Sequence, residues 1–172
     1  FGGKEDYIYS NEIWSLNTNN YSWKFISTIG DIPNHRSKHT AVKYKNKMIV
    51  FGGVTFSSIC NDLFEYDLIK NQWKEIKCKG NLPPVRTRCS ACVVRNQMIM
   101  FGGRQYLLEK NRRVYLNDLW FLKLINYQWE QIKSYGNIPS KRCAHSMVSN
   151  GDYVYIFGGY SESGYHLNDL YE

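Results

Sequence analysis

The sequence predicts an all-β protein built from repeats of one antiparallel sheet. The tripeptide Phe-Gly-Gly occurs at residues 1–3, 51–53, 101–103 and 157–159, so successive copies are 50, 50 and 56 residues apart. The apolar runs that lead into it, such as "KMIVFGG" and "QMIMFGG", have the length of a buried strand. No window shows the period of an amphipathic helix. A repeat of this length is typical of stacked supersecondary units.

Other positions recur in register with the glycines. An Asn-acid-apolar-aromatic step starts at Asn11, Asn61, Asn117 and Asn168. A tryptophan follows at Trp23, Trp73 and Trp129, then a Gly-x-apolar-Pro turn, then an arginine at Arg36, Arg86 and Arg142. The six extra residues of the third unit all lie between Gly103 and Asn117, which indicates a loop that tolerates insertion.

Each unit is expected to form four strands. In the unit that contains Trp73 they cover residues 38–44, 48–51, 61–67 and 72–77, with polar turns joining the first to the second and the third to the fourth. The fourth strand mixes Trp73 with Lys74 and Glu75, as expected for a solvated outer edge. Four antiparallel strands in about fifty residues make one propeller blade.

The glycine pair, the Asn-Asp step, the spaced tryptophan and the Gly-x-x-Pro-x-x-Arg-x-x-His segment together resemble the kelch repeat over the whole chain. The resemblance implies a kelch-type β-propeller, commonly six-bladed, whose usual function is to bind another protein.

On this interpretation the chain holds about 3.4 repeats of four-stranded antiparallel blades. Whole blades cover residues 38–78 and 88–134, and partial blades cover residues 1–28 and 143–172. Both partial blades would supply the third strand. We therefore expect a piece of a longer chain with further blades or domains. Pairing of two half rings is the rival account.

The composition narrows the classes of function that the protein can have. The chain of 172 residues carries a formal net charge of +7, but its lysines are scattered through predicted turns and outer strands. We therefore expect a solvated surface and not a nucleic-acid partner. Five cysteines without framework spacing favour a reducing compartment, so we expect a cytoplasmic protein, with the nucleus as the alternative. No stretch has the length and apolarity of a membrane span.

No catalytic or metal-binding motif stands out. Cys89 and Cys92 in "CSAC" suggest a metal pair, but residues three apart on a strand face opposite sides of the sheet. His39 and His145 recur at the start of the innermost strand, where we expect buried histidines bonded to the backbone; ligands around a channel are the alternative. We predict no catalytic residue, no metal and no cofactor. The alternative is an enzyme or small-ligand protein of the same fold whose active residues lie in missing blades.

The strand directions predict which face of the propeller binds a partner. Because the four strands alternate in direction, the connections between second and third strands and those between blades emerge on the same face, which holds the long loops. Aromatic residues and arginine are the usual anchors of interfaces, and arginine binds a carboxylate or phosphate through two bonds. We predict that this face binds other proteins, including acidic or phosphorylated peptides, through Arg88, Arg104, Arg112, Arg113, Tyr7, Phe56, Tyr106, Tyr115, Tyr160 and Tyr165, with Lys110 adding charge.

Residues used in the same way in every unit are expected to serve the fold. The glycines allow close backbone approach, and Trp73 and Trp129 cover the sheet faces between blades. The arginines pair with the recurrent acids Glu12, Asp62, Asp118 and Asp169 and fix one blade to the next. The structural set is Gly2, Gly3, Gly52, Gly53, Gly102, Gly103, Gly158, Gly159, Trp23, Trp73, Trp129, Arg36, Arg86 and Arg142.

Overall fold

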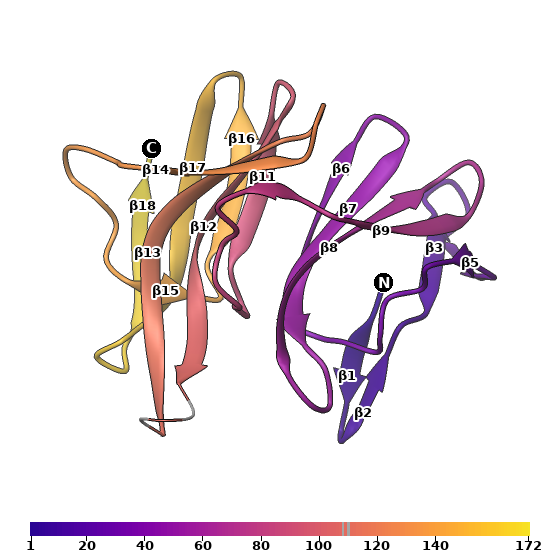
Figure 1. Cartoon of the computed structure of the whole chain (residues 1–172), viewed down its shortest axis with the longest axis horizontal. Coiled ribbons are helices and arrows are strands. Elements are labelled where there is room, and N and C mark those ends of the chain that lie inside the picture. The colour runs from indigo at the N-terminus through magenta and orange to yellow at the C-terminus, as the bar shows by residue number, and fades with distance from the viewer. Residues whose placement is uncertain (108, 110) are drawn as a thin grey trace.

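A computed structural model describes residues 1–107, 109 and 111–172. The regular elements are β-strands in sheets that follow one another from the N-terminal to the C-terminal unit (Figure 1). Within the described residues no helix has the length and apolarity needed to cross a membrane.

The two complete blades have the same strand order, from the innermost strand outward. In the first they are β6 (Thr40–Tyr44), β7 (Lys47–Val54), β8 (Ile59–Asp67) and β9 (Gln72–Ile76). In the second they are β11 (Ser90–Val94), β12 (Gln97–Leu107), β13 (Arg112–Lys123) and β14 (Gln128–Ile132). All four strands of each blade are antiparallel to their neighbours in this series.

Two partial units flank them. The N-terminal unit contains β1 (Gly3–Glu5), β2 (Ile8–Ser10), β3 (Ile13–Asn17) and β4 (Ser22–Ile26). The C-terminal unit contains β15 (Arg142–Cys143), β16 (Ser146–Asn150), β17 (Tyr153–Ser161) and β18 (His166–Tyr171).

The prediction that the fourth strand is the outer edge of the sheet is wrong for the two complete blades, although Lys74 is exposed as expected. The linker from the preceding unit adds a short fifth strand to each complete blade: β5 (Ile29–Gly30) pairs in parallel with β9, and β10 (Lys79–Gly80) with β14. The Asp31 amide also donates to the Trp73 carbonyl at 3.1 Å. Each linker runs from the outermost strand of one blade to the innermost strand of the next. On the way it forms main-chain hydrogen bonds with the fourth strand of that next blade.

The apolar cores lie between neighbouring sheets. Trp73 and Trp129 are 1% and 2% exposed, and their ring centroids lie 4.8 Å from Phe1 and 5.0 Å from Phe51, which belong to the preceding units. The prediction that these tryptophans cover the faces between blades is confirmed. Trp23 is 64% exposed, because no described sheet packs on its side.

The glycine pair marks a bulge where the second strand changes register. The pairing of β7 with β8 shifts between Phe51 and Gly53, and that of β12 with β13 shifts at the same place. A Cβ on Gly53 would lie 2.8 Å from the Ser37 carbonyl oxygen, so the incoming linker needs glycine there. All eight residues have positive φ: Gly2, Gly3, Gly52, Gly53, Gly102, Gly103, Gly158 and Gly159.

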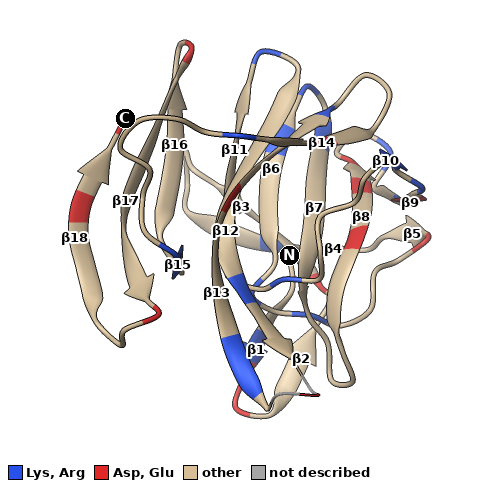
Figure 2. Ribbon diagram, turned by 60° about the vertical axis from the view of Figure 1, so that its left-hand side comes forward, with Lys and Arg blue, Asp and Glu red and all other residues tan. Residues whose placement is uncertain are grey.

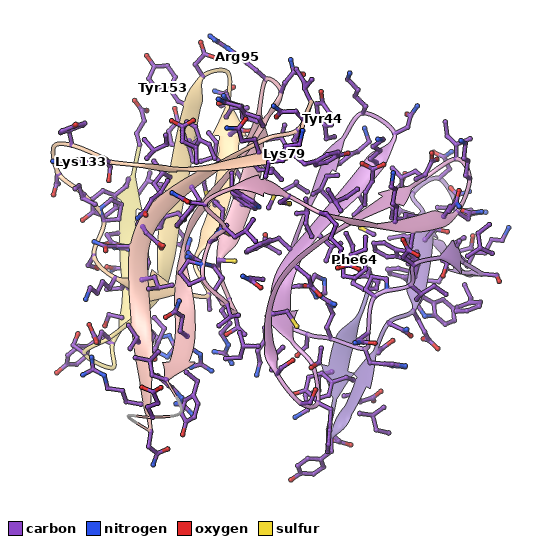
Figure 3. All side chains as sticks on the ribbon, viewed as in Figure 1. Tyr44, Phe64, Lys79, Arg95, Lys133 and Tyr153 are labelled. Atoms are coloured by element: carbon purple, nitrogen blue, oxygen red, sulfur yellow. The ribbon has the colours of Figure 1, made fainter. Side chains whose placement is uncertain are left out.

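The two faces of the molecule differ as the strand directions predict. The loops between second and third strands all emerge at the lower edge of Figure 1, and the tight turns lie at the upper edge. Figure 3 places Tyr44, Arg95 and Tyr153 at that upper edge. There the Tyr44 hydroxyl donates to Asn96 at 2.8 Å, and Arg95 pairs with Asp152 at 2.6 Å, so turns of neighbouring blades are bound to each other.

Alanine at two equivalent linker glycines should separate backbone strain from close contact. Gly80 and Gly136 have φ of 80° and 79°. A Cβ would lie 2.5 Å from the Trp129 carbonyl oxygen at Gly80 and meet nothing within 4 Å at Gly136. We expect Gly136→Ala to lower the free energy of unfolding by about 1 kcal/mol and Gly80→Ala by about 3 kcal/mol in urea titrations. Equal losses would contradict the importance of the contact between β10 and β14.

Candidate functional site

Three buried arginines bind in the same way in successive units. Arg86 is 0% exposed, and its Nε donates to the Pro84 carbonyl at 3.2 Å. Its Nη1 donates to the Gly102 carbonyl at 3.0 Å, and both Nη atoms donate to the Asp118 carboxylate at 2.8 Å. The guanidinium also lies over the Trp120 ring, 6.0 Å from its centroid. This planar group is suited to such a bidentate site in a way that lysine is not.

The predicted pairing with the recurrent acids is confirmed for three of the four. Arg36 pairs with Asp62 at 2.7 Å and Arg142 with Asp169 at 2.6 Å. The bonds from Arg142 lower the pKa of the Asp169 carboxyl below its ordinary value. Glu12 instead accepts a bond from Trp14 Nε1 at 3.0 Å.

The main chain completes the link between blades. Each ion pair joins a linker to the blade that follows it, as with Arg86 and Asp118. The Arg86 amide donates to the Cys60 carbonyl at 3.1 Å and its carbonyl accepts from the Gly53 amide at 3.0 Å, both in the blade before it. Asn61 of that blade also donates to the Pro83 carbonyl at 3.2 Å. Side chain and main chain together therefore fix one blade to the next, and these guanidinium groups are not available to a partner.

Removing one acid from this system should be costly. Asp118→Asn leaves the buried Arg86 guanidinium without its counter-charge, and we expect the free energy of unfolding to fall by about 3 kcal/mol. The matched control is Asp152→Asn, since the Arg95–Asp152 pair is exposed and should contribute less than about 1 kcal/mol. Urea titration of both variants measures the difference. Similar small losses would show that the buried pair does not hold the linker.

Main-chain hydrogen bonds join successive blades just before their innermost strands. Lys38, Arg88 and Ala144 occupy equivalent places and have left-handed φ of 58°, 57° and 55°. The Arg88 amide donates to the Lys38 carbonyl at 2.9 Å, and the Ala144 amide donates to the Arg88 carbonyl at 2.8 Å. The main chains of these residues are thus held next to one another where each linker enters its innermost strand.

The β12–β13 hairpin directs further arginines toward this line. Arg104 pairs with Tyr115, and Tyr106 with Arg113, so these four side chains share one face of the hairpin. Two main-chain bonds of 2.9 Å between Arg104 and Thr87 fix the base of the hairpin. Figure 2 shows the basic segments of β12 and β13 near their lower ends.

Three arginines meet at a hollow of about 660 Å³, called here the basic hollow. Its lining includes Arg88, Arg104, Arg113, Tyr160 and His166. The Tyr160 ring lies 5.1 Å from that of His166 and 6.1 Å from that of Tyr115. The hollow thus combines guanidinium groups with flat aromatic surface.

The charge of the basic hollow lacks an internal counterpart. In the described part of the chain, no carboxylate lies within ion-pair distance of Arg88, Arg104 or Arg113. Burial lowers the pKa of Lys38, and the charges of Arg88, Arg104, Lys4 and Arg113 lower it further. Burial raises the pKa of the nearby Cys143 thiol, while the charges of Arg104 and Arg88 act in the opposite direction. A bound anion would relieve this repulsion.

The structure brings together half of the predicted partner-binding residues. Five meet at or beside the basic hollow: Arg88, Arg104, Arg113, Tyr115 and Tyr160. Tyr106 shares the hairpin face, but its hydroxyl donates to Asn111. Arg112 pairs with Leu107 and faces the other side, and Lys110 lies outside the described residues.

The remaining aromatic residues lie elsewhere on the surface. Tyr7, Phe56 and Tyr165 are 89%, 92% and 71% exposed in loops, and none of them lines the basic hollow. Sequence reasoning did not single out Lys38 or His166. For Lys38 a signal was present, because the repeat aligns it with Arg88.

The two cysteines of "CSAC" face opposite sides, as predicted. Cys89 packs in the core shared with Val42 and Leu122, and Cys92 in the core shared with Ile99 and Met147. Burial raises the pKa of the Cys89 thiol to about 12, so it stays protonated and unreactive near neutral pH. Within residues 1–107, 109 and 111–172 there is no group of three or more His, Cys, Asp or Glu placed to hold a metal ion.

The expectation of a backbone-bonded histidine is not met at His39, whose Nδ1 is buried without a hydrogen-bond partner among the described residues. At His145 neither ring nitrogen has a partner with full hydrogen-bond geometry among those residues, but the main chain at Phe101 lies close enough to act on the imidazole and raise its pKa against the effect of burial. The rings are held by packing, 5.1 Å from Phe1 and 5.6 Å from Phe101. Burial is the main cause that lowers the pKa of each histidine from 6.5 to about 4.

These histidines predict acid sensitivity. Because their pKa is lower in the folded state, the unfolded chain binds more protons between pH 6.5 and about 4. The free energy of unfolding should be highest above pH 6.5 and fall in this window, by up to about 1.4 kcal/mol per pH unit for each histidine. Cys89 occupies the same place in the third unit, so His39→Cys with His145→Cys should flatten the profile. An unchanged slope would contradict the assignment.

Sheets repeated as blades, each bound through a buried arginine at its entry, define a kelch-type propeller protein. Residues 1–159 match the family described as the KLHDC2/KLHL20/DRC7 Kelch-repeats domain. The chain belongs to the kelch-repeat family, as the resemblance of its motifs predicted.

Several relatives are much longer than this chain. It is 46% identical over 166 residues to Kelch repeat-containing protein 2 of Saccharomyces cerevisiae, a match that covers 92% of the chain and 18% of that protein. It is 40% identical over 176 residues to Tip elongation aberrant protein 1 of Schizosaccharomyces pombe, covering 99% of the chain and 15% of that protein. The chain therefore spans less than a fifth of the length of these relatives.

The fold is shared with the solved structure of YjhT. The two superpose with a TM-score of 0.77 at 17% identity, over 96% of this chain and 50% of that one. The chain thus corresponds to half of that propeller.

Proposed function

We propose that the chain is a non-catalytic scaffold that binds an acidic or phosphorylated segment of a partner protein at the basic hollow. One observation carries the proposal: Arg88, Arg104 and Arg113 converge on one hollow and no carboxylate in the described chain pairs with them. The repeated arginines differ, since each is buried against its own aspartate. The fold therefore does not require the charge of the three converging residues.

The chemistry of the lining fits an extended anionic segment. Guanidinium groups bind carboxylate or phosphate oxygens through two parallel bonds, which are stronger than bonds between neutral groups. Tyr160 and His166 beside them offer flat surface for neighbouring side chains, and aromatic residues with arginine are common energetic centres of interfaces. The hollow lies on the face that carries the long loops, where rigid scaffolds usually hold their binding residues.

The proposal includes a reducing compartment, the cytosol or the nucleus. All five cysteines are unpaired, which is usual for proteins in such a compartment and unusual for secreted ones.

The two faces of one hairpin provide a test with an internal control. We expect Arg104→Ala with Arg113→Ala to weaken binding of a phosphoserine peptide or a glutamate-rich peptide by 10- to 100-fold, about 1.4 to 3 kcal/mol. Arg113→Ala alone removes one charge from the hollow and should weaken binding about 10-fold, whereas Arg112→Ala removes one charge from the opposite face and should change affinity less than about twofold. Isothermal titration against each peptide, with an uncharged peptide as reference, measures this.

Two results would contradict the proposal. If Arg112→Ala weakened binding as much as Arg113→Ala, net charge and not the hollow would attract the peptide. If generic duplex DNA bound with steep salt dependence while the acidic peptides did not bind, the basic surface would belong to a nucleic-acid site.

A further inference from the structure

Positive charge continues from the basic hollow onto the neighbouring units. Arg88 and Arg104 line the hollow from the second complete blade. Lys38 and Lys4, in the two units before it, are exposed. In the described part of the chain no carboxylate lies within ion-pair distance of either lysine. Neither the fold nor the binding of one anionic group at the hollow uses these two charges.

The main chain places Lys38 directly beside Arg88, on the side away from the basic hollow. The Arg88 amide donates to the Lys38 carbonyl at 2.9 Å, and the Ala144 amide donates to the Arg88 carbonyl at 2.8 Å. Ala144 lines the basic hollow, whereas Lys38 does not. Arg88 therefore lies between the hollow on one side and Lys38 on the other.

Lys4 adds a further charge from a second repeated position. Arg104 directly follows the glycine pair of its unit, and Lys4 has the same place in the N-terminal unit. The Lys4 Nζ lies 5.4 Å from the ring centroid of Tyr7 and 5.3 Å from that of Tyr9. Such cation–π contacts hold an ammonium group in place without neutralising its charge.

Charges from three units lie close enough to repel one another. Burial is the main cause that lowers the pKa of Lys38, and the positive charges of Arg88, Arg104, Lys4 and Arg113 lower it further. These residues therefore form one basic surface that extends from the N-terminal unit to the hairpin of the second complete blade. Anions bound along this surface would relieve the repulsion.

We propose that Lys4 and Lys38 form a second anion subsite, and that the partner segment carries two phosphates, one bound in the basic hollow and one at this subsite. The inference rests on the proposed function, which it makes more specific. A phosphate group carries a charge of about −1.5 to −2 near neutral pH. Two phosphates therefore match the charge of this surface more closely than two carboxylates do.

The contact between Lys38 and Arg88 limits the separation of the two phosphates. Main chains joined by a hydrogen bond lie about 5 Å apart, so the second subsite directly adjoins the arginine of the first. An extended segment rises about 3.3 Å per residue. Phosphates two to four residues apart therefore span about 7 to 13 Å and reach both places without a loop in the segment.

Peptides with one or two phosphoserines test the proposal on the chain as it exists. The probes share one sequence and carry either a single phosphoserine or a second one placed two, three or four residues away. By fluorescence anisotropy at fixed ionic strength, we expect the best doubly phosphorylated peptide to bind at least about tenfold more tightly than the singly phosphorylated peptide, because the second group binds within the same complex.

Two lysines matched in charge and backbone conformation locate the second subsite. Lys38 and Lys45 have left-handed φ of 58° and 51°, but Lys45 lies in the turn between β6 and β7 on the opposite face (Figure 1). Lys38→Gln should reduce the gain from the second phosphate to less than about threefold, whereas Lys45→Gln should preserve it. Affinity of both variants for the singly phosphorylated peptide should stay within about twofold, which shows that they remain folded with an intact hollow.

Three results would overturn the inference while leaving the basic hollow in place. The second phosphate could add less than about twofold at every spacing. Lys38→Gln and Lys45→Gln could reduce the gain equally, which would assign it to net charge. Inorganic tripolyphosphate could bind as tightly as the doubly phosphorylated peptide, which would assign the surface to a small polyanion and not to a protein segment. Only the failure of every phosphorylated and acidic peptide to bind would contradict the proposed function as well.

Discussion

The fold depends on the buried pair of an arginine with an aspartate at the entry to each blade. A sheet of about fifty residues with an apolar face on each side cannot bury both faces by itself. Each blade therefore needs a neighbouring blade packed against it at a fixed angle. The Arg86 guanidinium holds the linker to the third strand of its own blade, and its main chain holds the blade before it. One residue thereby fixes the position of two sheets.

The same repetition separates the charges that the fold uses from those that we propose bind a partner. Where every unit uses the same side chain, as at Arg36, Arg86 and Arg142, the group is buried and fully engaged. Where the repeat fixes only the main chain, as at Lys38, Arg88 and Ala144, the side chain is free to differ. The arginines of the basic hollow belong to such variable places and to the insertion in the third unit, which suits a surface that recognises one particular partner.

Much of this architecture could be predicted from the sequence, because it repeats. The four strands, the shared face of the long loops, the tryptophans between blades and the acids paired with Arg36, Arg86 and Arg142 all follow from aligned positions. The five-stranded blades could not be predicted, since β5 and β10 are two residues long and pair through the main chain. The opposite directions of Arg112 and Arg113 depend on the register of a hairpin within an insertion, which no other unit repeats. The ring nitrogens of His145 are buried without a partner of full hydrogen-bond geometry among the described residues. This too depends on the packing around the ring, which cannot be predicted from the residue type.

The most direct test of the central claim is the reactivity of individual arginines. Phenylglyoxal modification of the native chain, followed by peptide mass spectrometry, reports each guanidinium separately. Arg36, Arg86 and Arg142 should stay unmodified until the chain unfolds, while Arg88, Arg104 and Arg113 should react and be protected by an acidic peptide. Early modification of Arg86, or reaction at Arg104 that the peptide leaves unchanged, would contradict the division between structural and binding arginines.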